Sequence, residues 1–150
     1  ILTTINREDT TVATAVEACI PQLTQLTDAV VEVLKQGGSL VYVGAGTSGR
    51  LGVLDAAECP PTFNVDPSMV QAVIAGGAVA MVQAVEGAED EAEAGRQAMV
   101  DLLDKLWRND TDKPAVLPVV VGLSASGSAR FVQAAVQLAR QRGCVTGSIG

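Results

Sequence analysis

The stretch LVYVGAGTSGRLGVLDAAEC, residues 40–59, decides the fold class of this chain. It opens with a continuous apolar run, Leu40–Val43, which is typical of a parallel strand buried on both faces. A glycine-rich turn over Gly44–Gly49 follows, and the apolar spacing after Arg50 is that of a helix through about Cys59. The stretch therefore predicts a strand, a turn and a helix, in the order that α/β proteins repeat.

The same order recurs along the rest of the chain. Three further strands are expected, at Val70–Ala75, at Val116–Leu123 and from Cys144 onward. Helical segments are expected between them, at Ala78–Ala84, Glu89–Leu106 and Ala129–Gln141. Because the strand ends are rich in glycine and serine, the pattern predicts a doubly wound parallel sheet with ligands at the carboxyl ends of its strands.

Residues 1–37 predict a helical hairpin that precedes the sheet. Thr10–Ile20 carries its apolar residues on one helical face, and Pro21 suits the first turn of a second helix that ends before Gly37. We therefore divide the chain into this N-terminal helical segment and one α/β domain over residues 38–150. Because the sequence opens at Ile1 rather than Met and stops just after a strand begins, we expect both ends to belong to something longer, with the domain truncated at its C-terminus.

Composition excludes several classes of protein. The formal net charge is -7 and lysine and arginine form no cluster, which argues against nucleic acid or an anionic membrane as a partner. No histidine is present, so catalysis by a Ser-His-Asp or Cys-His set is excluded within this chain. The three cysteines are dispersed, which indicates neither a disulfide framework nor a zinc site and favours a reducing compartment. With no secretory signal and no apolar stretch of roughly 18–20 residues, we expect a cytoplasmic protein whose acid and base groups are carboxylates.

The glycine-rich turn GAGTSG, residues 44–49, matches the pattern GxGxxG, which by itself is a weak signal because such turns also simply link a strand to a helix. Thr47 and Ser48, however, place hydroxyls at a helix N-terminus, where free N–H groups and the helix dipole favour a phosphate. A second turn of the same chemistry, SASGS, follows another strand. The next strand ends in Ala75-Gly76-Gly77 without the acid that a dinucleotide needs, so a phosphomonoester fits better. The residues expected to hold it are Gly46, Thr47, Ser48 and Gly49 in the first turn and Ser124, Ser126, Gly127 and Ser128 in the second.

Two carboxylates are candidates for acid–base chemistry. Glu58 precedes two prolines at the predicted end of a helix, where the dipole disfavours the ionised form, so it could act as a general acid. Glu89 lies at a predicted helix start, where the ionised form is favoured, so it could act as a base. The residues alone leave the alternatives open: a solvated glutamate at a frayed helix end, and an ordinary acid at a helix start.

Four motifs together carry a resemblance to a known family. GAGTSGRLG at residues 44–52, DAAECPPT at 55–62, IAGG at 74–77 and VEGAED at 85–90 resemble, in order and spacing, the motifs of N-acetylmuramic acid 6-phosphate etherases. This family belongs to the sugar isomerase (SIS) superfamily, whose domain is flavodoxin-like. The resemblance runs from Ile5–Asp9 to the last strand, and it implies that a complete family member continues for a comparable length beyond Gly150.

The resemblance also implies a reaction. It implies cleavage of the D-lactyl ether of N-acetylmuramic acid 6-phosphate, a phosphorylated amino sugar, to N-acetylglucosamine 6-phosphate and D-lactate by elimination and then water addition. It implies no metal or organic cofactor, and a homodimer with residues of both subunits lining the site. In the family, the glutamate that matches Glu58 donates a proton to the leaving lactate oxygen, and the one that matches Glu89 is the second active-site carboxylate, assigned here as the base at C2. One stretch departs from the family, since SGSARFV at residues 126–132 stands where SGRTPYV is typical.

Two other functions remain as alternatives. SIS domains in the glucokinase regulatory protein and in transcription regulators bind sugar phosphates without converting them, and aldose–ketose phosphosugar isomerases also need a carboxylate base. The presence of both Glu58 and Glu89 in their motifs favours an enzyme. The sequence Glu-Cys-Pro-Pro at residues 58–61 favours the etherase over the isomerase.

Overall fold

The computed structural model describes residues 1–108 and 116–150. Its centre is a parallel sheet in the order β2-β1-β3-β4, with Leu40 in register with Val70 on one side and Val119 on the other. The strands are β1 (Leu40–Gly44), β2 (Val70–Ile74), β3 (Val119–Leu123) and β4 (Val145–Ile149). The predicted α/β class with a parallel sheet is confirmed, since every crossover returns the chain in the same direction.

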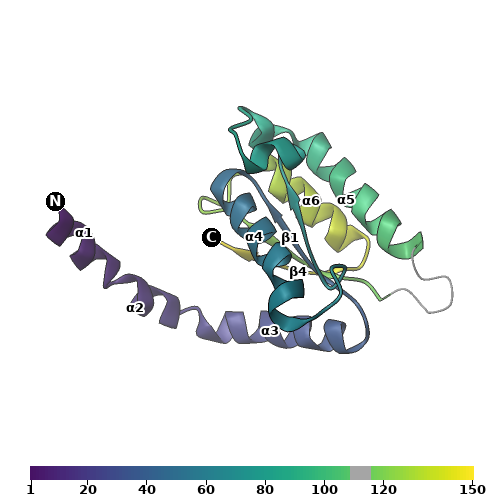
Figure 1. Cartoon of the computed structure of the whole chain (residues 1–150), viewed down its shortest axis with the longest axis horizontal. Coiled ribbons are helices and arrows are strands. Elements are labelled where there is room, and N and C mark those ends of the chain that lie inside the picture. Colours follow the sequence, from purple (N-terminus) through teal and green to yellow (C-terminus); the bar gives the residue numbers. More distant parts are fainter. Residues whose placement is uncertain (109–115) are drawn as a thin grey trace.

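Helices cover both faces of the sheet (Figure 1). On one face lie α3 (Ile20–Lys35) and α4 (Gly46–Phe63), and Gly52 of α4 packs directly against the Tyr42 side chain. On the other face lie α5 (Ala92–Arg108) and α6 (Arg130–Gln141), which share the main core with β1 and β3. The innermost side chains of this core are fully buried: Val41, Val43, Met99, Leu103, Val120, Ala135 and Ala139. The side-chain alternation of β1 therefore sends its valines to one helical layer and Tyr42 to the other.

The N-terminal part is helical, as the sequence predicts. It forms α1 (Leu2–Asp9), α2 (Val12–Glu17) and α3, and Figure 1 shows α1 and α2 extending away from the sheet. Every residue of α1 and α2 is exposed, whereas α3 places Leu26 against the Gly147 backbone of β4. Within residues 1–108 and 116–150, no helix is both long and apolar enough to cross a membrane.

Several predicted boundaries are wrong, and each has a local cause. The first core helix does not stop at Cys59 but continues to Phe63, where Asn64 takes a left-handed conformation (φ 53°, ψ 45°) that ends it. Strand β3 begins at Val119 rather than Val116, because Pro118 has no N–H to donate to the sheet. The segment after β2 forms two short 3-10 helices, η1 (Gly77–Met81) and η2 (Ala88–Asp90), so α5 begins at Ala92 rather than Glu89.

Candidate functional site

The glycine-rich turn after β1 places the N-terminus of α4 at the carboxyl edge of the sheet. Ala45 is extended (φ -130°, ψ 152°) and precedes the helix, which begins at Gly46 with φ 53°. The first hydrogen bond that closes a helical turn runs from the Gly49 N–H to the Ala45 oxygen at 3.1 Å. The N–H groups of Gly46, Thr47 and Ser48 precede it and point out of the helix end, where an anion is favoured.

Gly49 has a packing role instead of the expected ligand role. Its N–H is already donated to Ala45, so it is not a free donor for a phosphate, and this part of the predicted cradle is corrected. A Cβ on Gly49 would lie 2.8 Å from the carbonyl carbon of Gly44, and a Cβ on Gly44 would lie 2.5 Å from the Gly49 Cα. The two glycines therefore allow the strand and the helix to cross in backbone contact, which fixes where the helix end points.

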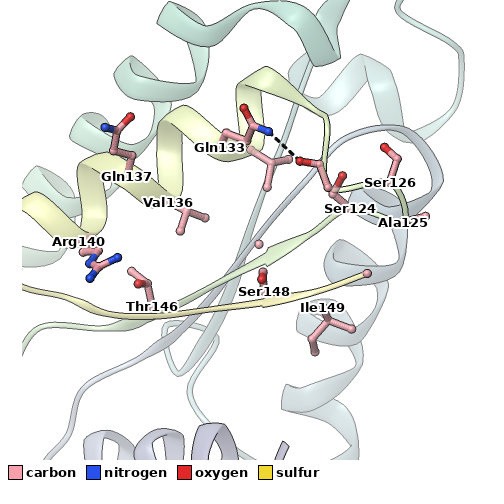
Figure 2. A pocket seen from close by; sticks show the side chains of 14 residues that line it. Ser124, Ala125, Ser126, Gln133, Val136, Gln137, Arg140, Thr146, Ser148 and Ile149 are labelled. Carbon is pink, nitrogen blue, oxygen red and sulfur yellow. Dashed lines mark hydrogen bonds between the residues drawn. The ribbon is translucent and has the colours of Figure 1, made fainter. Parts of the chain in front are cut away.

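The second turn, Ser124–Ser128, which we call the serine turn, follows β3 and leads into α6. Its Ser126 and Ser128 hydroxyls lie 2.6 Å apart in a hydrogen bond, and the Gly127 N–H donates to the Ser124 oxygen at 3.0 Å. Gly127 has φ 68°, which glycine adopts without steric cost. Gln133 of α6 donates from Nε2 to the Gly127 oxygen at 2.8 Å, as the dashed line in Figure 2 shows. The turn is thus held by its own hydroxyls and by one side chain of the following helix.

The two turns meet around one cavity of about 430 Å³. It combines the start of α4, the turn after β3 and the acidic residues of η2, which come from three separate parts of the chain. Its lining residues are Ala45, Gly46, Ser48, Glu89, Asp90, Leu123, Ser124, Ala125, Ser126, Ser128 and Ala129. Neither lysine nor arginine is among these described lining residues, so an anion here would be held by N–H and hydroxyl dipoles.

Most of the expected site residues lie together in this cavity, and four do not. Gly46, Ser48, Ser124, Ser126, Ser128 and Glu89 line it, whereas Thr47, Gly49, Gly127 and Glu58 do not. Gly127 faces a neighbouring cavity of about 680 Å³ on the other side of the serine turn, between α6 and β4. Figure 2 shows that Ser124 and Ser126 stand at one end of this second cavity and Arg140 at the other.

Glu89 lies in the cavity, in the short 3-10 helix η2 rather than at the start of α5. It is the middle residue of η2 and is exposed, three residues before α5 begins. The predicted start of α5 at Glu89 is therefore wrong, while the role of Glu89 as a base stays a prediction. Its neighbour Asp90, which the sequence analysis passed over, lines the same cavity.

Glu58 is exposed on α4, five residues before the helix ends at Phe63. The expectation that it sits at the helix C-terminus is wrong, because Pro60 and Pro61 lie inside the last turns without ending the helix. The dipole argument for a protonated Glu58 therefore fails, since the effect is confined to the last turn. A conformational signal for the true end was present in the sequence, because asparagine at position 64 tolerates the left-handed region better than most residues.

The other acid of the same motif, Asp55, has a structural partner that sequence reasoning missed. Burial raises the pKa of Tyr42 to about 12, and a hydrogen bond to Asp55, the charge of Asp55 and, at high pH, the thiolate of Cys59 add to the effect. Burial and the Asp55 charge also raise the pKa of the Cys59 thiol. Tyr42 and Cys59 therefore stay neutral at physiological pH.

Over residues 1–108 and 116–150, no group of three or more Cys, Asp or Glu side chains has the arrangement that could hold a metal ion. Glu89 and Asp90 are two neighbouring acids beside hydroxyls, which suits contacts to sugar hydroxyl groups rather than metal coordination.

Comparison with known proteins gives the class of protein that this fold and cavity define. The model of the family "Glucokinase regulatory protein N-terminal SIS domain" matches residues 22–140, so the chain belongs to this family of SIS domains.

Curated relatives then connect the chain with one kind of enzyme, and the resemblance stated above is confirmed. The N-acetylmuramic acid 6-phosphate etherase of Glaesserella parasuis is 47% identical over 151 residues, which cover 99% of this chain and 46% of the relative. That of Caldanaerobacter subterraneus is 47% identical over 146 residues, covering 97% and 44%, and that of Yersinia pestis is 48% identical over 149 residues, covering 99% and 47%. The chain thus spans a little under half the length of these relatives.

Proposed function

We propose that this chain forms the phosphosugar-binding and carboxylate-bearing part of an etherase that cleaves the D-lactyl ether of N-acetylmuramic acid 6-phosphate. The observation that carries the proposal is the single cavity that joins the start of α4, the serine turn and Glu89. The matches to the etherase relatives cover 97–99% of the chain, which supports the same substrate class. The regulator and isomerase alternatives share the phosphate site but do not require a leaving-group acid.

In the proposed reaction the phosphate binds at the N–H groups of Gly46, Thr47 and Ser48, with the Ser126 and Ser128 hydroxyls turned from each other toward its oxygens. The open-chain sugar then extends toward η2. Glu89 removes the proton at C2, the C3–O bond breaks, and the lactate oxygen takes a proton from Glu58. This step releases D-lactate and leaves a C2–C3 double bond. Water then adds across it: Glu58 takes a proton from the water as its oxygen joins C3, and Glu89 returns the proton to C2, which gives N-acetylglucosamine 6-phosphate.

Glu58 lies outside the cavity, which constrains this mechanism. Another part of the enzyme therefore has to bring the exposed Glu58 side chain of α4 and the leaving oxygen together. We propose that this part is a second copy of the chain in a homodimer. We further propose that the enzyme works in the cytoplasm, in the breakdown of cell-wall amino sugars.

A chimaera tests the proposed activity. This chain replaces the matching residues of the Glaesserella parasuis etherase, and D-lactate release from N-acetylmuramic acid 6-phosphate is measured against the unaltered relative. We expect release by the chimaera and none by its Glu89→Gln variant. A folded chimaera that binds the phosphosugar but releases no lactate would contradict the proposal and favour a regulator.

A further inference from the structure

The segment that carries Glu89 packs on the rest of the protein mainly through small side chains. Residues 75–91 connect β2 to α5 and include three glycines with left-handed φ, at Gly76 (82°), Gly77 (65°) and Gly87 (76°). Val82 at its centre is 89% exposed, whereas Ala80 is buried and Ala88 packs against the main core. Because these two anchors are small and the residues between them are largely exposed, polar contacts to this stretch add to what fixes its position.

Arg50 supplies that contact from the beginning of α4. Its Nε donates to the Ala80 oxygen at 2.8 Å and its second terminal nitrogen donates to the Gln83 oxygen at 3.2 Å. These bonds span 30 and 33 residues of sequence. The planar guanidinium can hold two carbonyls at once, which a lysine ammonium does less well.

We propose that Arg50 is a positioning residue that fixes the Glu89 segment relative to the phosphate-binding end of α4, and that it is not a phosphate ligand. An arginine directly after a phosphate-binding glycine turn would ordinarily be assigned to the phosphate. Here Arg50 does not line the cavity, and two of its donors are bonded to η1 and the residues after it. The N-terminal end of α4 thereby serves both parts of the site: its N–H groups receive the phosphate, and its arginine sets the place of Glu89. The catalytic part of this inference rests on the proposed function.

Hydrogen exchange of the chain itself tests the clamp without any substrate. We expect Arg50→Met to accelerate exchange of the Val82, Gln83 and Asp90 amides about tenfold, because two hydrogen bonds from a charged donor are lost. Arg50→Lys should keep part of the protection. The matched control is Arg7→Met, which removes only an exposed ion pair at 3.5 Å from α1 and should change nothing in this segment. Unchanged exchange in both Arg50 variants, with the fold intact by circular dichroism, would overturn the clamp.

Ligand binding and turnover separate the two roles of Arg50. The Arg50→Met chain should bind N-acetylglucosamine 6-phosphate within about twofold of the parent, while the same change in the chimaera should lower kcat about tenfold with KM little altered and partial rescue by Arg50→Lys. A loss of affinity of about tenfold with unchanged exchange would make Arg50 a phosphate ligand and reject the inference. If the parent chimaera releases no lactate, the proposed function fails, whereas the exchange and binding results still decide whether Arg50 clamps the segment.

Discussion

Replacing Gly49 by alanine perturbs the contact on which the geometry of the site depends. The added methyl group would lie 2.7 Å from Ile74 Cγ1, 2.8 Å from the Gly44 carbonyl carbon and 2.9 Å from its oxygen. The isoleucine side chain can rotate, but the Gly44 backbone belongs to β1 and cannot yield without moving the strand or the helix. Alanine gains about 1 kcal/mol over glycine in a helix, whereas overpacking of this kind costs about 1–3 kcal/mol. The difference predicts a net loss of about 1 kcal/mol in the free energy of unfolding.

Urea unfolding followed by circular dichroism measures this loss, with Thr62→Ala in the exposed last turn of the same helix as the control. The control should stay within about 0.5 kcal/mol of the parent. Because the strained contact lies at the helix end, the Gly49→Ala chain should also lose affinity for sugar phosphates. A variant with parental stability and affinity would refute the view that backbone contact between Gly44 and Gly49 sets the phosphate site.

Three further predictions concern single side chains. Ser48→Ala should weaken phosphosugar binding by about 1–2 kcal/mol, as titration calorimetry would measure, because a hydrogen bond to a charged group is lost. In the active chimaera, Glu89→Gln should abolish exchange of the C2 hydrogen with deuterated solvent, whereas Glu58→Gln should slow lactate release and leave some exchange; persistent exchange in the first variant rejects Glu89 as the base. The pKa of Tyr42, raised to about 12 in the folded chain, favours the protonated folded state, so stability should fall by about 2 kcal/mol as pH rises from 10 to 12, and Tyr42→Phe should remove that dependence in urea titrations.

The sheet and its helices could be predicted because their signals are local. The apolar run at Leu40–Val43 and the helical spacing of Arg130–Gln141 each reflect burial on a fixed period, which the sequence displays directly. Pro60 and Pro61 misled the prediction of the end of α4, because prolines near a helix end remove hydrogen bonds without always stopping the backbone. Here the conformation of Asn64 sets the boundary.

The site could be predicted only in part, because its arrangement depends on contacts between distant residues. The meeting of the two turns followed from the rule that parallel strands end at the same edge of a sheet, and Ser48 and Ser124 do line one cavity. The bonds of Arg50 to residues 30 and 33 positions away, and that of Tyr42 to Asp55, have no such rule. The separation of Glu58 from the cavity likewise depends on how α4 lies on the sheet, which no local pattern encodes.

The most direct test of the account compares the affinity of this 150-residue chain for N-acetylglucosamine 6-phosphate with its affinity for N-acetylglucosamine, by titration calorimetry at low and high salt. The N–H groups at the start of α4 and the serine hydroxyls should hold the phosphate, so the phosphorylated sugar should bind at least about tenfold more tightly. Ser48→Ala should reduce that preference. Equal affinity for the two sugars would contradict the phosphate site on which the proposed function is built.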